Sequence, residues 1–464
     1  MNLSDYKKIH FAGIGGISMS GLAEILLNNG HIISGSDNSE SDITRHLQSV
    51  GVTISIGQKA ENIKPDTDLF VYTAALKPDN PEIVEAKRLG LKIVDRAELL
   101  GSMMKNYTYP ISISGTHGKT TTTSMITEIL LANGSDPAVT VGGILSSIGG
   151  NYRIGAKDYF VVESCEYCDS FLKFNPFSAI ILNVDYDHAD YFKSLDQLYT
   201  SFNTFAKRVP EDGFLVVNSE IPNLEKVIEG VSCKVIKYGL NNNDGWTAEN
   251  ISFDENGYGS YDAVLNGEKI YDIQLSVTGK HNISNSLAAA ALCYEHKIPK
   301  ESIEKGLKNF KGTNRRFEYK GTFNDVTVVD DYAHHPTEIK STLSAAKAKK
   351  ANKMWCVFQP HTFSRTKSLL KEFSESFDDA DNIIILDIYP AREKDDGTIH
   401  SKNLVDLIAK RGKNVLYMDS FEKAEKYLIE HCTKNDLLIT MGAGDVYLVG
   451  EHILSTISTE LHTI

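Results

Sequence analysis

The chain of 464 residues has few cysteines and no long apolar segment. Its six cysteines are too sparse for a disulfide framework and are typical of a reduced cytosolic protein. Cys165 and Cys168 have CxxC spacing, but no second pair stands at zinc-binding spacing, so we expect two free thiols. No run reaches the roughly 18 apolar residues of a transmembrane helix. The first residues, MNLSDYKKIHFAGIGG, contain no separate apolar core before a cleavage site, so we expect no signal peptide, no membrane insertion and a cytoplasmic location.

An excess of positive charge is also missing. The chain has 48 Lys and Arg against 61 Asp and Glu, a formal net charge of −13. Proteins that bind nucleic acids or membrane surfaces need a basic excess, so we expect neither partner. A hydrophobic content of 41% and a charged content of 23% are typical of globular proteins, which excludes a disordered or coiled-coil chain. At about 150 residues per domain, the length predicts three domains.

Apolar runs and helical patterns alternate along most of the chain. Such alternation predicts parallel sheets covered by helices, and hence an α/β fold. The pattern is interrupted at the polar stretch KNYTYP and resumes after two adjacent arginines near residue 315. We therefore expect domains at residues 1–107, 108–314 and 315–464. Residues 241–280 are polar, glycine-rich and short-stranded, which predicts hairpins.

The sharpest local signal is GTHGKTT, which stands between an apolar strand and a helix. Glycines allow consecutive backbone N–H groups to surround phosphate oxygens, and the helix N-terminus that follows favours negative charge. In such a loop Lys119 reaches the β- and γ-phosphates, and the Thr120 hydroxyl binds Mg²⁺. Ile113 stands where the common pattern has its first glycine, so the loop is shortened. The expected ATP-binding residues of the loop are Gly115, Thr116, His117, Gly118, Lys119, Thr120 and Thr121.

A second glycine loop, GIGGISMSG, follows the first predicted strand and precedes a helix. Gly13 and Gly15 match the dinucleotide-binding fingerprint, but Ser18 occupies the place of its third glycine. Asp37 follows at about the distance of an acid that binds a ribose. Three interpretations stay open for this loop: NAD binding, binding of another phosphate-bearing nucleotide, or tight strand–helix packing without a ligand.

Further polar groups follow predicted strands, where ligands bind in open α/β sheets. Glu163 ends the run YFVVE, the place of a Mg²⁺-binding carboxylate in phosphate-loop enzymes. Asp187 and His188 follow SAIILNV, and a surface turn is the alternative interpretation. The last region has the polar clusters DDYAHHP, QPH, SRT, YPARE and GAGD. Several clusters in one region favour a site over chance.

Together these residues resemble those of the Mur ligases. The motifs run through nearly the whole chain in the order GIGG with MSG, GSD, GTHGKTTTT, ESCEY, DHADYF, HNISN, NRRFE, DDYAHHPTE, FQPHTFSRT and YPAREK. GTHGKT alone indicates only the wider amide-ligase superfamily, whereas GIGGxxMSG and DDYAHHP are typical of the branch that activates muramate. The resemblance implies a Rossmann-like N-terminal domain for a UDP-sugar, a central phosphate-loop ATPase-type α/β domain, and a Rossmann-like C-terminal domain for an amino acid.

The resemblance implies an ATP-driven amide ligase of peptidoglycan synthesis. The carboxylate of UDP-N-acetylmuramate attacks the γ-phosphate of ATP, L-alanine attacks the resulting acyl phosphate, and ADP and phosphate leave. No covalent enzyme nucleophile is needed, because catalysis rests on positioning and on charge neutralisation. The implied cofactors are ATP and two Mg²⁺ ions. We expect a monomer or a homodimer.

The same resemblance assigns residues beyond the phosphate loop. Lys119, Glu163 and His188 are the expected catalytic residues, and Thr120, Glu163 and His188 the expected metal ligands. The further expected ATP contacts are Asn282, Arg316 and, on the ribose, Asp330. The expected UDP-sugar residues are Gly15, Gly16, Ser36, Asp37 and Thr73. The residues expected to orient the amino acid or the muramate carboxylate are His335, His361, Arg365 and Arg392.

One position departs from the family pattern. Several Mur ligases carry a carbamylated lysine shortly after the motif that matches DHADYF, where this chain has Asn203, with Lys207 nearest, so we assign no carbamate. Within the family, the alternative substrate is a preformed tripeptide in a recycling reaction, because pocket shape decides the choice. Outside it, the alternatives are an NAD-dependent oxidoreductase, which leaves GTHGKT and Glu163 unexplained, and an ATP-binding switch that controls a partner.

Overall fold

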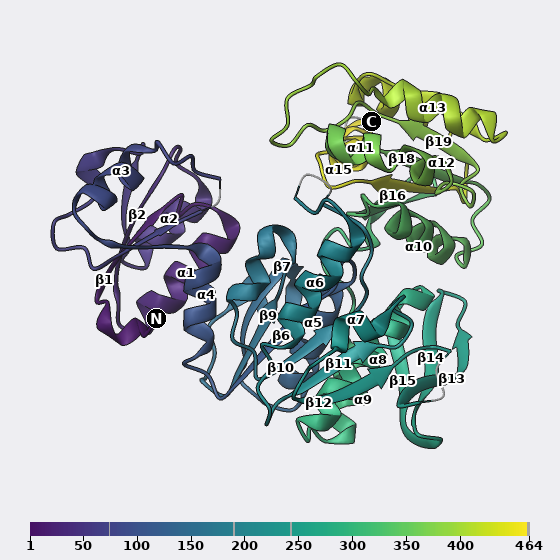
Figure 1. Ribbon diagram of the computed structural model, residues 1–464. Coiled ribbons are helices and arrows are strands. Elements are labelled where there is room, and N and C mark those ends of the chain that lie inside the picture. Colours follow the sequence, from purple (N-terminus) through teal and green to yellow (C-terminus); the bar gives the residue numbers. More distant parts are fainter. Residues whose placement is uncertain (74, 189–190, 242–243, 462–464) are drawn as a thin grey trace.

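The protein folds into three α/β domains, each built on its own sheet (Figure 1). The computed structural model describes residues 1–73, 75–188, 191–241 and 244–461. The chain passes from the first sheet to the second between residues 95 and 109, and from the second to the third between residues 278 and 318. The predicted fold class is confirmed, and the exact domain limits stay predictions.

The N-terminal domain has a five-stranded parallel sheet in the order β3-β2-β1-β4-β5. Its elements are η1 (Leu3–Asp5), β1 (Lys8–Ala12), α1 (Ile17–Asn28), β2 (Ile32–Asp37), α2 (Asp42–Ser49), β3 (Thr53–Ile56), η2 (Ala60–Asn62), β4 (Leu69–Tyr72), α3 (Pro81–Arg88), β5 (Lys92–Asp95) and α4 (Arg96–Met104). Almost every residue of β1 is buried, because helices cover both faces of a parallel sheet.

The central domain has a ten-stranded mixed sheet in the order β15-β14-β13-β12-β11-β10-β6-β9-β7-β8. Its first elements are β6 (Tyr109–Ser114), α5 (Lys119–Ala132), β7 (Ala138–Leu145), η3 (Ser146–Ile148), β8 (Gly150–Arg153), β9 (Tyr159–Glu163), η4 (Tyr167–Lys173), β10 (Ser178–Ile181) and α6 (Leu195–Ala206). The others are β11 (Phe214–Asn218), α7 (Leu224–Ile228), β12 (Lys234–Tyr238), β13 (Trp246–Phe253), β14 (Tyr258–Leu265), β15 (Glu268–Thr278), α8 (Lys280–Glu295) and α9 (Lys300–Asn309). Strands β13, β14 and β15 pair antiparallel, as the hairpin prediction required.

The C-terminal domain has a six-stranded sheet in the order β16-β17-β21-β18-β19-β20, parallel except for the edge strand β16. Its elements are β16 (Glu318–Phe323), β17 (Val326–Asp331), α10 (Pro336–Lys347), β18 (Met354–Phe358), α11 (Phe363–Ser368), α12 (Leu370–Ser374), β19 (Asn382–Ile385), α13 (Ser401–Lys410), β20 (Asn414–Tyr417), α14 (Phe421–His431), β21 (Leu437–Met441) and α15 (Tyr447–Leu461). Figure 1 shows this domain beside the central one, across a boundary formed in part by α10.

Neighbouring domains meet at two boundaries. The N-terminal and central domains share one hydrophobic core, in which α4 packs against η4. The central and C-terminal domains meet where the loops after β6 and β10 face α10 and α11. Because ligands bind beyond the carboxyl ends of parallel strands, both boundaries are places for a site.

Candidate active site

The phosphate loop spans the turn between β6 and α5, and its backbone needs glycine. Gly118 is the N-cap of α5 and has φ +81°, in the left-handed region. A Cβ atom at this position would come within 2.6 Å of Asn285 Oδ1, so a larger residue has no room. No side chain caps α5. Its first N–H groups therefore point out of the helix without an intrahelical partner, as an anion requires.

Lys119 lies back over the loop, between its carbonyl groups and a buried carboxylate. Its Nζ donates to the carbonyl oxygens of Gly115 and Thr116, and to Glu166 Oε2 at 3.0 Å. Burial lowers the pKa of this ammonium group, but Glu166, Cys165 and Glu163 together outweigh burial, and the net pKa is raised. Lys119 is therefore charged at neutral pH and lies at the centre of the predicted phosphate site.

Thr120 and Glu163 lie at the phosphate loop with two side-chain oxygen groups, a hydroxyl and a carboxylate. The Thr120 hydroxyl donates to Glu163 Oε1 at 3.0 Å, and the other oxygen of Glu163 accepts from the Gly142 N–H at 2.6 Å. These two residues are the ones predicted to bind a metal. Among the described residues, no three or more His, Cys, Asp or Glu side chains are grouped so that they could hold a metal ion.

A cavity beside His188 lies between the central and C-terminal domains. It is lined by Tyr167, Tyr186, Asp187, His188, His361, Thr362, Ser364, Arg365, Ser368, Leu369, Ala391, Arg392 and Glu393. Arg365 binds the buried Asp187 through two hydrogen bonds, and its Nη1 contacts His361 Nδ1 at 3.0 Å. The structure thus brings together three of the four residues predicted to orient a carboxylate.

The fourth of these residues, His335, lies elsewhere. It caps α10 by accepting from the Thr337 N–H, and its ring packs 4.6 Å from that of His117. Only 5% of its surface is exposed, and it is not among the residues that line the cavity beside His188. His335 therefore packs at the domain boundary, outside that cavity, and its predicted contact with a substrate carboxylate stays a prediction.

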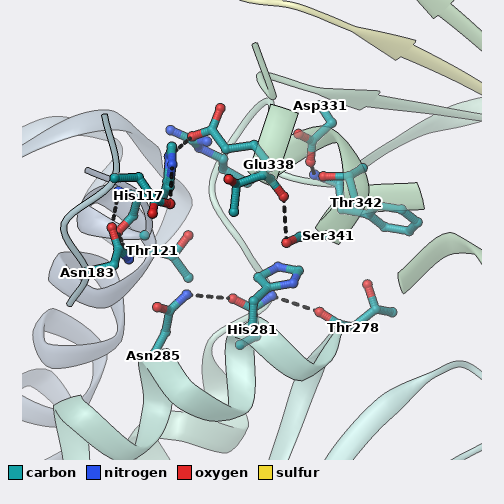
Figure 2. A pocket seen from close by; sticks show the side chains of 16 residues that line it. His117, Thr121, Asn183, Thr278, His281, Asn285, Asp331, Glu338, Ser341 and Thr342 are labelled. Carbon is teal, nitrogen blue, oxygen red and sulfur yellow. Dashed lines mark hydrogen bonds and ion pairs between the residues drawn. The ribbon is translucent and has the colours of Figure 1, made fainter. Parts of the chain in front are cut away.

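A second cavity begins at the phosphate loop and runs along α8 and α10 (Figure 2). It is lined by His117, Gly118, Thr121, Asn183, Asp185, Thr278, His281, Asn282, Asn285, Arg316, Phe317, Asp331, Thr337, Glu338, Ser341 and Thr342. Asn282 and Asn285 lie on the first turns of α8 and are joined by a 3.2 Å hydrogen bond. The predicted ATP residues Thr121, Asn282 and Arg316 thus lie in one cavity with the phosphate loop.

Asp330, the predicted ribose contact, lies outside this cavity, and its contact with ATP stays a prediction. Its carboxylate accepts from Arg315 Nε at 3.0 Å and from the Thr440 hydroxyl at 2.7 Å. Its neighbour Asp331 lines the cavity instead. Both residues belong to β17, where successive side chains point to opposite faces, so only Asp331 faces this cavity.

His117 joins the phosphate loop to the C-terminal domain. Its Nδ1 lies 3.1 Å from Glu338 on α10, and its Nε2 lies 3.2 Å from Asp185 in the loop after β10. Burial lowers the pKa of this imidazole, but the nearby carboxylates of Asp185 and Glu338 together outweigh burial and raise it to about 9. At neutral pH a charged His117 therefore links the two domains beside the cavity of Figure 2.

The glycine loop of the N-terminal domain lies between β1 and α1. The Gly15 N–H donates to Asp37 Oδ2 at 2.8 Å, and Gly16 is the N-cap of α1. Thr73 lies against Gly13, where a Cβ atom would come within 2.7 Å of its methyl group. Asp37 and Thr73 thus lie against the glycine loop that contains Gly15 and Gly16.

Ser36 does not present its side chain to this loop. Its hydroxyl is buried and donates to Glu82 Oε2 at 2.6 Å, inside the N-terminal domain. Only its backbone carbonyl faces the glycine loop, where it accepts from the N–H groups of Gly13 and Ile14. The hydroxyl of Ser36 is therefore engaged inside the domain, and the predicted contact of this residue with the UDP-sugar stays a prediction.

Sequence reasoning overlooked several residues of the site. Asn285, Glu338 and Asp331 line the cavity of Figure 2, and Glu166 accepts a hydrogen bond from Lys119. All four stand inside the motifs HNISN, DDYAHHPTE and ESCEY, so the motifs contained the signal. Asn203, the position without a carbamylated lysine, donates to the carbonyl groups of Val227 and Glu229 and takes no part in the cavities.

Known proteins resemble the chain along its whole length. Residues 8–108 match the Mur ligase family catalytic domain, residues 113–293 the Mur ligase middle domain, and residues 315–444 the Mur ligase glutamate ligase domain. The chain is 52% identical over 450 residues to UDP-N-acetylmuramate–L-alanine ligase of Acetivibrio thermocellus, covering 97% of this chain and 96% of that protein. It is 53% identical over 447 residues to the ligase of the same name from Lachnospira eligens, covering 96% and 97%.

Solved structures give the same result. The UDP-N-acetylmuramate–alanine ligase of Thermotoga maritima superposes with a TM-score of 0.81 at 28% identity, covering 98% of this chain and 99% of that one. A murein peptide ligase of Psychrobacter arcticus superposes with a TM-score of 0.69 at 26% identity, covering 97% and 98%.

Three α/β domains around a phosphate loop define an ATP-dependent ligase. The chain belongs to the Mur ligase family.

Proposed function

We propose that the protein joins L-alanine to the carboxylate of UDP-N-acetylmuramate in peptidoglycan synthesis, with release of ADP and phosphate. The observation that carries this proposal is the position of Lys119. It follows Gly118, which lines the cavity of Figure 2, and it binds Glu166. The other oxygen of Glu166 lies 3.9 Å from Nε2 of His188, which lines the interdomain cavity that contains Arg365. The relatives that share half of its residues are named for the same reaction.

The side chains divide the work between the three substrates. Asn282, Asn285 and Asp331 would hold the nucleoside of ATP in the cavity of Figure 2, and Lys119 would neutralise the charge on the transferred phosphoryl group. Arg365 and the exposed Arg392 would orient carboxylates in the cavity beside His188. A carboxylate held there next to the γ-phosphate becomes an acyl phosphate, which the amine of L-alanine then attacks.

The oxygen donors near Lys119 fit Mg²⁺. Thr120 and Glu163 supply a hydroxyl and a carboxylate within hydrogen-bonding distance of each other. Mg²⁺ prefers such oxygen ligands, and it usually takes its remaining ligands from phosphate and water. Thr120 and Glu163 would therefore hold one ion, which neutralises phosphate charge when it is bound. A second ion would lie near His188, whose Nε2 is 3.9 Å from carboxylate oxygens of Glu166 and Asp187.

A second candidate within the family is ligation of a preformed tripeptide. The likeness to a murein peptide ligase structure keeps it open as the alternative. Among the described residues, no helix is long and apolar enough to cross a membrane. We propose a cytoplasmic location, where all three substrates of the alanine reaction are found.

The test is phosphate release from ATP with UDP-N-acetylmuramate and a panel of amino acids and tripeptides. We expect release only when UDP-N-acetylmuramate and L-alanine are both present. Release with the tripeptide but not with L-alanine would favour the recycling reaction. Oxidation of NADPH at 340 nm without ATP turnover would favour an oxidoreductase. ATP hydrolysis that neither substrate stimulates would favour an ATP-binding switch.

A further inference from the structure

The β7–β8 hairpin of the central domain packs against α1 of the N-terminal domain. The Tyr152 hydroxyl on β8 donates to Glu24 Oε2 on α1 at 2.5 Å. The Tyr152 ring lies against Gly21 of α1, where a Cβ atom would come within 2.7 Å of it. At the start of the helix, the side-chain amide of Asn151 lies 3.5 Å from the Ile17 carbonyl oxygen. The hairpin is thus fixed through β8 on the helix that follows the N-terminal glycine loop.

The other strand of the hairpin reaches the carboxylate of Glu163. Strand β7 pairs with β9 as far as Thr140, which lies opposite Val162, and Glu163 is the next residue of β9. The pairing of β7 with β8 is irregular directly after Thr140. In this irregular stretch the Gly142 N–H donates to Glu163 Oε2 at 2.6 Å. Irregularities of this kind are common beside active sites, where they re-aim a group or end the regular pairing.

Two consecutive glycines allow β7 to approach the metal-binding pair so closely. A Cβ atom at Gly142 would come within 2.7 Å of Glu163 Oε1, and one at Gly143 within 3.2 Å of the Thr120 methyl group. The Gly142 N–H thus holds one oxygen of Glu163, while the Thr120 hydroxyl contacts the other. Hydrogen bonds of this kind orient a metal-binding carboxylate, and their loss typically weakens metal binding. The position of β7 therefore affects the orientation of Glu163.

We propose that Tyr152 is a positioning residue for the Mg²⁺ site, because it holds the β7–β8 hairpin on α1 and thereby keeps the Gly142 N–H on Glu163. This inference rests on the proposed function, which assigns one Mg²⁺ ion to this carboxylate. Tyr152 lies opposite Thr140, two residues before Gly142, so a shift of β8 moves the donor. Burial and the hydrogen bond to Glu24 raise the pKa of Tyr152, so its hydroxyl keeps its proton at neutral pH. A helix of the N-terminal domain thus helps to orient a metal ligand of the central domain.

The test is calorimetric titration of the full chain with AMP-PNP, an ATP analogue whose nitrogen bridge resists hydrolysis. Each protein is titrated once with excess Mg²⁺ and once with EDTA, and the ratio of the two affinities gives the contribution of the metal. For Tyr152→Phe we expect this ratio to fall by about 3- to 10-fold, with the affinity in EDTA unchanged. Gly142→Ala, which places a methyl group against Glu163, should lower the ratio by about 10-fold or more.

Further variants separate positioning from folding. Glu24→Gln keeps an acceptor for the Tyr152 hydroxyl and should retain most of the wild-type ratio, whereas Glu24→Ala should lose as much as Tyr152→Phe. Combining Glu24→Ala with Tyr152→Phe should cause no further loss, because both remove the same hydrogen bond. The matched control is Tyr199→Phe, which removes a hydrogen bond to the Pro222 carbonyl in the same domain and should leave the ratio unchanged.

A ratio in Tyr152→Phe that equals those of the wild type and Tyr199→Phe would overturn the inference, even if the melting temperature fell. Equal weakening with Mg²⁺ and with EDTA would overturn it as well, because the hairpin would then act on the nucleotide site instead of the metal. A wild-type protein whose affinity for AMP-PNP does not depend on Mg²⁺ would contradict the Mg²⁺ site of the proposed function, and the inference with it.

Discussion

Arg365 of the C-terminal domain binds Asp187 of the central domain through two hydrogen bonds, from Nε to Oδ1 at 2.9 Å and from Nη2 to Oδ2 at 3.2 Å. Both side chains are buried. The Arg365 guanidinium holds the pKa of Asp187 well below its usual range, against the effect of burial. The Asp187 carboxylate thus occupies the Nε and Nη2 side of the guanidinium, so Arg365 would meet a substrate carboxylate through Nη1, which also contacts His361. The same pair fixes the distance between the two domains at the cavity beside His188.

Replacement of Arg365 by lysine should impair the use of L-alanine. Lysine keeps the charge but cannot make the two parallel hydrogen bonds of the guanidinium. We expect kcat/KM for L-alanine to fall by about 10- to 100-fold, while the KM for ATP changes little. Steady-state phosphate release gives both values. The control is Lys367→Gln, an exposed position on the same helix that bonds Thr398, and equal effects of the two variants would contradict a role for Arg365.

Lys119→Ala should abolish turnover and leave UDP-N-acetylmuramate binding near normal. The reason is that Lys119 lies in the central domain, whereas the UDP-sugar site belongs to the N-terminal one. Loss of a charge at the transferred phosphoryl group should lower kcat by at least about 100-fold. Phosphate release and calorimetric titration measure the two effects separately. Loss of both turnover and UDP-N-acetylmuramate binding in the folded variant would contradict this division between the domains.

The His117 bridge should make the domain contact sensitive to pH. The pKa of His117 rises from 6.5 to about 9 in the fold, so the bridge stabilises fully below pH 6.5 and loses its effect as pH rises toward 9. The pKa of Glu338 is lowered despite burial, chiefly by His334 and His117, so this carboxylate stays charged throughout that window. We expect Glu338→Gln to lower stability by about 1–3 kcal/mol near pH 6, and by less near pH 9.

Thermal melting of the wild type and Glu338→Gln across this pH range measures the effect. Glu430→Gln, at an exposed position of α14, is the control and should show no difference at any pH. A difference between wild type and Glu338→Gln that stays constant from pH 6 to 9 would contradict the role of a charged His117, leaving only the capping of α10 by Glu338.

Asp331 and Asp330 should respond differently to the same substitution. Asp331→Asn should raise the KM for ATP by about 10-fold, because Asp331 lines the nucleotide cavity. Asp330→Asn should instead lower the melting temperature, since it weakens the buried contacts with Arg315 and Thr440. Burial raises the pKa of Asp331 to about 6, although Arg316 opposes the shift. Asp331 loses its proton as pH rises through about 6, so a change in ATP affinity caused by its charge should occur near that pH. The reverse pattern in the two variants would restore the assignment to Asp330.

The difference between these two residues illustrates what the sequence could and could not predict. Strands and the phosphate loop were predictable, because apolar runs, glycines and the following helix are local signals. Whether Asp330 or Asp331 faces the nucleotide depends on the phase of a single strand against a helix of another domain. The direction of the Ser36 hydroxyl, which donates to the buried Glu82, was unpredictable for the same reason.

Contacts between distant segments were beyond sequence reasoning. Tyr152 and Glu24, which share a hydrogen bond, are 128 residues apart, and no motif joins them. The link from His117 to Glu338 spans 221 residues and exists only because the C-terminal domain packs on the phosphate loop. Glu166 stands inside a quoted motif, but its role follows from the fold, which leaves its carboxylate 1% exposed beside Lys119. Residues that act through a neighbour in space therefore needed the structure.

Oxygen transfer tests most directly whether ATP activates the muramate carboxylate. The measurement uses UDP-N-acetylmuramate labelled with oxygen-18 in its carboxylate, together with ATP and L-alanine, and mass spectrometry of the released phosphate. An acyl phosphate retains the carboxylate oxygen on phosphorus when the amine displaces it. The account predicts one labelled oxygen in the phosphate for each amide formed. Unlabelled phosphate accompanied by labelled amide product would contradict it.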